Sequence, residues 1–208
     1  FVELVDSVSK VILDANPADL DAALALDVNG QTVSEAVVSA TATIGEKITL
    51  RRFAVVDKTD EDTFGSYIHM GGKISAVAVV KGGNEDVAKD IAMQVASMAP
   101  QFVSEKDIPA ETIEHERNIQ IEIVKNDPDL ADKPEQVING IIKGRVSKSL
   151  QEISLVDQVY FKDGKAKVAA FLKAENAEVL SFVRFALGEG IEKKVEDFAE
   201  EVAKASQV

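Results

Sequence analysis

The sequence predicts an α+β fold with duplicated core subdomains, an inserted antiparallel helical hairpin and a C-terminal helix. Strands and helices come in separate blocks, whereas strict alternation would indicate a parallel sheet. Two strand-like segments nearly repeat each other, and two long helical segments flank a short acidic turn. We therefore expect each core subdomain to hold a small antiparallel sheet packed by helices.

The first thirty residues are expected to form two helices and a turn. Apolar residues recur at a helical period through residues 1–15. Pro17 then begins a short helix that runs to Leu26, and Asn29-Gly30 is a turn signal.

Residues 32–57 are expected to form a helix and a strand. Thr32 and Glu35 have the spacing of a capping box, which marks a helix N-terminus. The helix that they begin runs towards Ile44-Gly45. Residues 46–57 are rich in β-forming side chains and predict a strand.

A β-hairpin and a helix are expected next. Residues 63–70 and 73–81 are strand-like segments joined at Gly71-Gly72, a hairpin turn signal. Residues 82–84 end the hairpin, and a helix follows. One face of that helix is expected to carry Val87, Ile91, Val95 and Met98.

Two long helices, 109–125 and 135–150, are expected to form an antiparallel arm. Each has an apolar stripe, and the segment 126–129 between them contains a proline that cannot continue a helix. At 1.5 Å per residue the arm would be roughly 25 Å long, and it could project from the body. A helix at 166–175 and a strand at 178–187 follow, and then a last helix at 192–205.

An internal repeat suggests how the domains are organised. Residues 46–55 resemble residues 178–187, and Arg52-Phe53-Ala54 matches Arg184-Phe185-Ala186. Chance similarity between two strands is the alternative to a duplicated subdomain. We expect a first core subdomain at 1–60, a second at 61–190 that contains the arm (109–150), and a C-terminal module at 191–208. The hairpin of the first copy would then precede Phe1, so we expect a longer intact protein.

The composition limits the possible partners. Acidic residues outnumber basic ones by 36 to 23, and the net charge of -13 argues against nucleic acid as a direct partner. There is no cysteine, which excludes disulfides and zinc–thiolate sites and fits a cytoplasmic protein. No apolar run is long enough to span a bilayer, so we expect no membrane partner.

The sequence shows no catalytic constellation. His69 and His115 are far apart, and neither has the second histidine that a helical zinc site needs. The glycine pairs at 71–72 and 82–83 lack the spacing of a phosphate-binding loop. No nucleophile elbow is present. We expect no catalytic residues, no metal and no cofactor.

Five segments, in order along the chain, resemble the bacterial elongation factor Ts family, the exchange factors for the GTPase elongation factor Tu. They are Ile44-Gly45-Glu46 running into Arg51-Arg52-Phe53, Gly65-Ser66-Tyr67-Ile68-His69, Ile91-Ala92-Met93-Gln94-Val95-Ala96, Ser154-Leu155-Val156-Asp157-Gln158, and Val183-Arg184-Phe185 through Gly188-Glu189-Gly190-Ile191-Glu192-Lys193. The resemblance implies a protein that binds elongation factor Tu and promotes release of GDP during protein synthesis.

The resemblance also implies partner-binding residues. Ile44 and Gly45 match a family contact at the end of a core helix, and His69 matches a contacting histidine. Phe161 and Lys162 match a contact pair, although Val159-Tyr160-Phe161-Lys162 stands where the family often has Pro-Phe-Val. Core packing is the alternative for Ile44 and Phe161. The helix at 192–205 matches the module that docks on the nucleotide domain of the GTPase.

One departure from the family bears on activity. The Thr-Asp-Phe-Val segment, whose aromatic wedge disturbs the magnesium site of the GTPase, is absent from these 208 residues, as is the family's N-terminal domain. We therefore expect weak binding and slow exchange. Two other functions stay open: a scaffold that oligomerises through the arm, for instance as a homodimer, and an enzyme whose site precedes Phe1.

Overall fold

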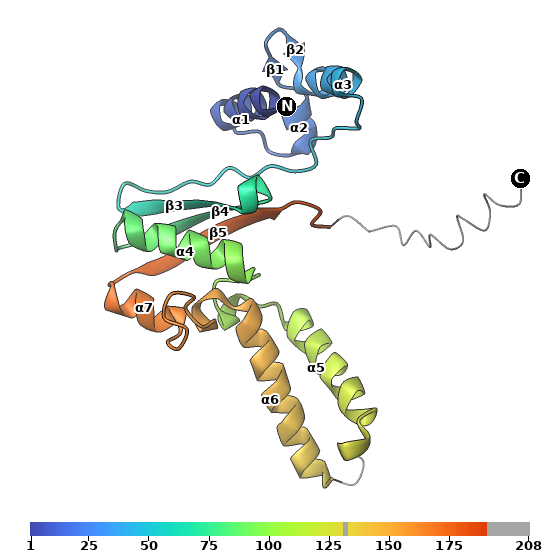
Figure 1. Cartoon of the computed structure of the whole chain (residues 1–208), viewed down its shortest axis with the longest axis vertical. Helices are drawn as coiled ribbons and strands as arrows, with labels where there is room; N and C mark the ends of the chain where they lie inside the picture. The colour runs from blue at the N-terminus through green and yellow to red at the C-terminus, as the bar shows by residue number, and fades with distance from the viewer. Residues whose placement is uncertain (131–132, 191–208) are drawn as a thin grey trace, which may run out of the picture. The chain divides into compact units, whose positions relative to one another are not determined.

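The computed structural model describes residues 1–130 and 133–190 (Figure 1). These residues form two compact units, one spanning Phe1–Asp57 and the other beginning at Lys58. Each unit holds a small antiparallel sheet together with helices, which confirms the α+β class. The helix expected at 192–205 lies outside the described residues.

The first unit contains three helices and a short β-hairpin whose strands have two residues each. Its helices are α1 (Val2–Ala15), α2 (Leu20–Leu24) and α3 (Val33–Ile44), and its strands are β1 (Asp27–Val28) and β2 (Gln31–Thr32). The turn between the strands is formed by Asn29 and Gly30, both with positive φ, which matches the twist of a tight hairpin. The turn prediction is thus confirmed, whereas the two short strands were not foreseen.

The start of α3 confirms the predicted capping box. Thr32 Oγ1 accepts a hydrogen bond from the backbone N–H of Glu35, and the Glu35 carboxylate accepts one from the backbone N–H of Thr32. These bonds satisfy two donors that a helix N-terminus would otherwise leave free. The helix then packs with α1 on a small apolar core. The buried members of that core are Val8, Ile12, Ala23, Val28, Val33, Ala36 and Val37.

The prediction of a strand at 46–57 is wrong. The segment has no regular secondary structure, although Ile48, Leu50, Phe53 and Val55 pack against the core of the first unit. Its β-forming side chains therefore supply packing contacts, although the segment is not a strand. A strand also needs a hydrogen-bonded neighbour, and no strand in the described part of the chain pairs with this segment. The sheet of the first unit is β1–β2 instead.

The second unit is built on a three-stranded antiparallel sheet of order β3-β4-β5. The strands are β3 (Asp62–His69), β4 (Ile74–Lys81) and β5 (Glu178–Ala186). The predicted hairpin is confirmed, with register from Asp62 opposite Lys81 to His69 opposite Ile74. β5, the strand expected at 178–187, pairs with β4 although the arm separates the two in sequence.

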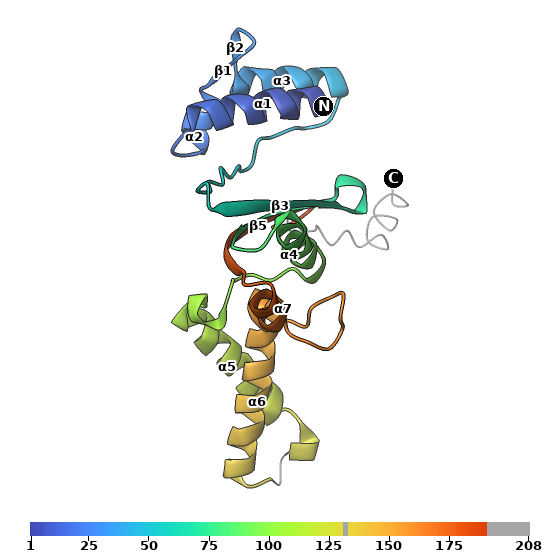
Figure 2. The same ribbon diagram turned by 90° about the vertical axis from the view of Figure 1, so that its left-hand side faces the viewer.

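Helix α4 (Glu85–Met98) covers one face of this sheet (Figure 2). The contact is close at Gly65, where an added Cβ would lie 1.8 Å from the carbonyl oxygen of Ala88. Only glycine therefore allows the helix to approach the strand so closely. Val87, Ile91 and Val95 are buried, as predicted, but Met98 is exposed because the helix ends there.

The arm consists of α5 (Ala110–Lys125) and α6 (Glu135–Ile153), which lie side by side and extend away from the sheet in both ribbon views. Between them is a 3-10 turn, Pro128–Leu130. The base of the arm is tied down where the backbone N–H groups of Gln101 and Phe102 donate to the carbonyl of Ile153. After a short 3-10 turn (Leu155–Asp157), α7 (Val168–Ala174) leads into β5.

Candidate partner-binding surface

Residues 158–162 form a loop that is fixed to α4 by polar contacts and to α7 by an aromatic contact. The Tyr160 hydroxyl donates a 2.8 Å hydrogen bond to Oδ2 of Asp90, and the ammonium of Lys162 pairs with Oδ1 of the same carboxylate. The ring of Tyr160 stacks on Phe171 at 4.3 Å, and the ring of Phe161 meets Tyr160 edge-on at 5.4 Å. One carboxylate on α4 thus holds two neighbouring residues of the loop.

The environment of Tyr160 disfavours its ionised form. The pKa of the Tyr160 hydroxyl is raised above its ordinary value, first by burial and then by the hydrogen bond to the Asp90 carboxylate. Both effects act in one direction, because a phenolate would lose hydration and would face a negative charge. Tyr160 therefore stays a neutral hydrogen-bond donor.

A pair of buried glutamines fixes the same loop from the core side. Gln94 is fully buried, and its Oε1 accepts a 2.9 Å hydrogen bond from the backbone N–H of Phe161. Its Nε2 donates to Oε1 of Gln158 and to the carbonyl of Val159. Gln158 in turn donates to the carbonyls of Met98 and Glu152. The network satisfies both amides, which is what allows them to lie in the core.

This scaffold presents Phe161 and Lys162 at the surface of the second unit. The Lys162 side chain is half exposed, and its ammonium lies 6.0 Å from the centre of the Phe161 ring, within cation–π range. Phe161 is half-buried and packs against the main core. Core packing is therefore part of its role, and the cation beside it is the more accessible group.

His69 ends β3, opposite Ile74, beside a turn of unusual backbone geometry. Met70, Gly71 and Gly72 all have positive φ, and the two glycines make this conformation accessible. The imidazole is half-buried, with its centre 5.7 Å from that of the Tyr67 ring. The next residue, Met70, is 61% exposed, whereas the exposed side chain of Ile68 lies on the opposite face of the strand.

Ile44 and Gly45 lie at the C-terminal end of α3 in the first unit. Ile44 is 45% exposed, so it is not a core residue. Gly45 caps the helix with φ 82° and donates its N–H to the carbonyl of Thr41 at 2.9 Å. A Cβ at Gly45 would meet nothing within 4 Å, so the left-handed backbone, and not lack of space, calls for glycine.

The five predicted contact residues therefore fall at three places. Ile44 adjoins Gly45 in the first unit, and Phe161 adjoins Lys162 in the second. Within the described ranges, no hydrogen bond, ion pair or ring contact joins His69 to the Phe161–Lys162 pair.

Two features are absent from the described residues, a metal site and a membrane-spanning helix. Among them, no three histidine or acidic side chains converge in a way that could hold a metal ion. No helix in the same ranges has both the length and the apolar character needed to cross a bilayer.

The buried glutamines are the part of this site that the sequence reasoning missed. Gln94 lies three residues after Ile91, on the face of α4 that turns toward the core. A polar side chain within an otherwise apolar helical stripe is a signal that could have found it, because such a group needs internal partners. The identity of the partner, 64 residues away at Gln158, is visible only in the fold.

Comparison with known proteins places these features in a family. The sequence model described as Elongation factor TS matches residues 1–189. The chain is 49% identical over 205 residues to elongation factor Ts of Leuconostoc mesenteroides, an alignment that covers 98% of this chain and 69% of that protein. It is 48% identical over 203 residues to the factors of Acholeplasma laidlawii and Levilactobacillus brevis, covering 97% of this chain and 69% and 68% of theirs.

Proposed function

The chain belongs to the elongation factor Ts family, and from this premise we propose that it binds the GTPase elongation factor Tu and promotes release of GDP during translation elongation in the cytoplasm. The observation that carries the proposal is the family match, which runs through residues 1–189 and so includes all three places where contact residues are predicted. No covalent chemistry on the chain's own side chains is required.

The action proposed is thermodynamic linkage between two ligands of the GTPase. If the factor binds the nucleotide-free GTPase more tightly than the GDP-bound one, it weakens GDP binding by the same ratio. A factor that bound both forms equally would shift nothing. Surface residues on this chain therefore matter only through the difference in free energy that they contribute to the two complexes.

The chemistry of the three places suits protein recognition. Ile44 offers an exposed apolar side chain at a helix end whose backbone is fixed by Gly45. Lys162 offers a cation held in place by Asp90, so less side-chain entropy is lost when a partner binds. His69 offers an aromatic ring beside the ring of Tyr67 and next in sequence to the exposed Met70. We assign all three places to contacts with elongation factor Tu.

The experiment is the release of a fluorescent GDP analogue from purified elongation factor Tu, measured by stopped flow with rising amounts of this chain. The variants Lys162→Ala and His69→Ala should slow the release roughly tenfold at sub-saturating factor, since loss of an interface hot spot costs more than about 1 kcal/mol. The matched controls are Lys165→Ala, an exposed lysine of the same segment, and His115→Ala, an exposed histidine on α5. Equal rates for variants and controls would remove these residues from the interface. No acceleration by the unmodified chain, together with no complex of the two proteins on a sizing column, would overturn the function.

Self-association through the arm is a second candidate, favoured by one observation. Ile119 and Ile123 lie one turn apart on α5 and are 39% and 47% exposed, on the side away from the α5–α6 contact. A pair of exposed isoleucines can seed a helix–helix interface. Sedimentation equilibrium of the chain and of Ile119→Ser/Ile123→Ser would decide: a concentration-dependent dimer that the variant abolishes supports this role, and a monomer at all concentrations excludes it.

A further inference from the structure

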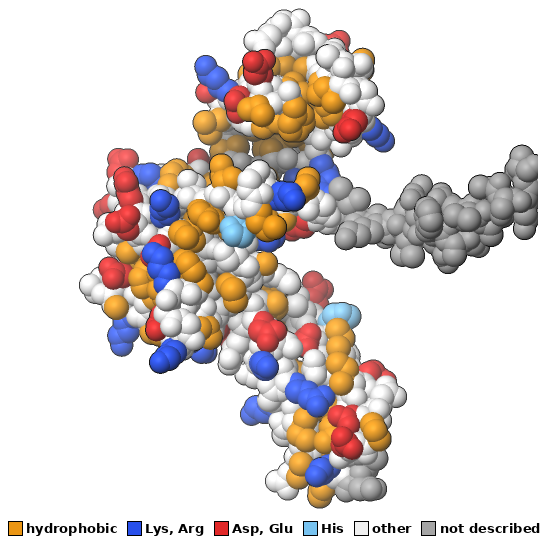
Figure 3. Space-filling view, in the orientation of Figure 1, with side chains coloured by type: hydrophobic (Ala, Val, Ile, Leu, Met, Phe, Trp, Pro, Cys, Tyr) orange, Lys and Arg blue, Asp and Glu red, His pale blue; other side chains and the backbone are white. Residues whose placement is uncertain are grey.

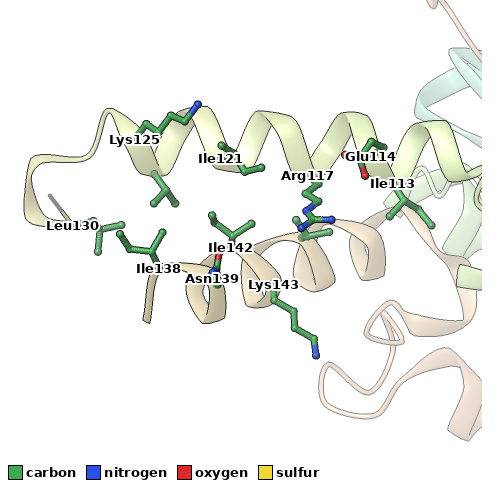
Figure 4. Close-up of a pocket in the computed structure, with 12 residues that line it drawn as sticks. Ile113, Glu114, Arg117, Ile121, Lys125, Leu130, Ile138, Asn139, Ile142 and Lys143 are labelled. Carbon is green, nitrogen blue, oxygen red and sulfur yellow. The ribbon is translucent and has the colours of Figure 1, made fainter. Parts of the chain in front are cut away.

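The arm carries an apolar groove that its two helices do not fill. The groove runs between α5 and α6 and encloses about 850 Å³ (Figure 4). Its apolar lining consists of Ile113, Ile121, Val124, Leu130, Ile138, Ile142 and Val146. Only Val124 among these is buried, and the other six remain partly open to solvent. Two helices alone thus leave the inner stripe incompletely covered.

The edges of the groove are basic, in contrast to the rest of the chain. Four charged residues line it, of which Arg117, Lys125 and Lys143 are cationic and Glu114 is anionic. Lys125 and Lys143 lie on opposite edges, and Arg117 reaches from α5 toward α6. In the whole sequence acidic residues predominate by 36 to 23, so the groove is a local reversal of charge.

Two of these cations have no carboxylate partner in the described part of the chain. Lys125 forms an ion pair with Glu122 on its own helix, but none of the ion pairs found there involves Arg117 or Lys143. Both side chains are exposed. Hydrophobic side chains also lie open along the arm in the space-filling view, with charged groups beside them (Figure 3).

We propose that this groove docks an amphipathic helix from a partner protein, with an apolar stripe for the floor and acidic side chains for Arg117 and Lys143. A third helix would complete the packing that a two-helix hairpin leaves unfinished, and helix-in-groove binding is a common mode of recognition. From Ile113 to Lys125 the groove is roughly 18 Å long, which fits a helix of about three turns. None of these groove residues is among the predicted contacts with the GTPase.

Charge complementarity selects the acidic helix over other occupants. A nucleic acid would gain from the cations, but its polar backbone could not cover an apolar floor. A basic helix would fill the groove equally well and would meet like charge on both edges. The groove therefore selects a helix whose buried face is apolar and whose two flanking faces carry acidic side chains.

The test uses a fluorescein-labelled synthetic peptide of fourteen residues, with leucines at helical spacing and glutamates on both flanks. Its twin carries lysine in place of each glutamate. Fluorescence anisotropy with the full chain should show saturable binding of the acidic peptide and binding of the basic twin that is weaker by roughly tenfold. The double variant Arg117→Glu/Lys143→Glu should invert this preference. The control Lys148→Glu/Lys165→Glu changes net charge equally at exposed lysines outside the groove and should alter both affinities by less than about twofold.

Other results would overturn the proposal. Absence of saturable binding, equal binding of the two peptides, or equal loss in the groove variant and the control would each show that the groove does not recognise an acidic helix. Circular dichroism of each variant establishes that the arm remains helical. A dimer of the unmodified chain in sedimentation, dissolved by Arg117→Glu/Lys143→Glu, would assign the groove to a second copy instead.

Discussion

The backbone N–H of Phe161 donates a 2.9 Å hydrogen bond to the side-chain oxygen of Gln94, although 67 residues separate the two in sequence. This bond joins a candidate partner contact to the most deeply buried polar side chain of α4. The surface at Phe161–Lys162 is therefore supported from inside the core. Substitutions of Gln94 should therefore alter the position of the Phe161–Lys162 surface, and partner binding measures that effect.

Replacement of Gln94 by leucine should destabilise the second unit and weaken partner binding. Leucine keeps the volume but leaves the Phe161 N–H, the Val159 carbonyl and Oε1 of Gln158 without their partner. We expect a loss of about 3 kcal/mol in the free energy of unfolding, since each buried unsatisfied group costs about 1–3 kcal/mol. Urea unfolding measures it, with the exposed Gln136→Leu as the matched control, expected within about 0.5 kcal/mol of the unmodified chain.

The same variant distinguishes a role of Gln94 in positioning the loop from a role in global stability alone. If Gln94 positions the loop, Gln94→Leu should raise the Kd for elongation factor Tu at a temperature where the variant is still folded, and Gln94→Glu should restore part of the affinity. The glutamate retains an acceptor for the Phe161 N–H but loses the two donors. Unchanged affinity in a folded Gln94→Leu would show that the loop does not contribute to binding.

Gly65 offers a test of how closely the helix must approach the sheet. Alanine at this position would place its Cβ 1.8 Å from the Ala88 carbonyl oxygen, so α4 and β3 would have to move apart. We expect a cost on the order of 3 kcal/mol, the upper end of what overpacking causes. In the control Gly140→Ala, on α6, the Cβ would meet nothing within 4 Å, and the chain should gain about 0.5–1 kcal/mol from helix propensity. Thermal unfolding of both variants should move in opposite directions, and a shared direction would contradict the packing argument.

Local chemistry explains which elements were predictable. The capping box at Thr32 and Glu35, the turn at Asn29-Gly30 and the hairpin at Gly71-Gly72 depend on residues only a few positions apart, and each was predicted. The strand predicted at 46–57 is absent, because side chains that favour a strand do not show whether a neighbouring strand is present. The Gln94–Gln158 pair was missed for a related reason. A glutamine at a core position of a helix indicates that a hydrogen-bond partner is needed, but the sequence does not show which residue is the partner.

The absent Thr-Asp-Phe-Val segment leads to a prediction about rate. This 208-residue chain should bind elongation factor Tu but accelerate GDP release less than the same chain carrying an N-terminal extension that supplies the segment. An interaction made only in the nucleotide-releasing complex changes the rate more than the affinity, and we expect the wedge to act in this way. An extension with alanine in place of the aromatic residue is the control, and it should release GDP as slowly as the unextended chain. Equal rates for all three chains would show that the wedge is dispensable.

Tyr160 should make the second unit sensitive to alkaline conditions. Burial and the hydrogen bond to Asp90 raise the pKa of its hydroxyl in the folded state above the ordinary value of 10. A raised pKa means that the folded chain holds the proton more tightly than the unfolded chain, so the stabilisation is complete below pH 10 and is lost as the pH rises toward the folded-state pKa. Urea unfolding between pH 8 and pH 11 should therefore show a steeper loss of stability for the unmodified chain than for Tyr160→Phe. Phenylalanine keeps the stacking on Phe171 but has no proton to lose, and parallel curves for the two proteins would exclude Tyr160 as the titrating group.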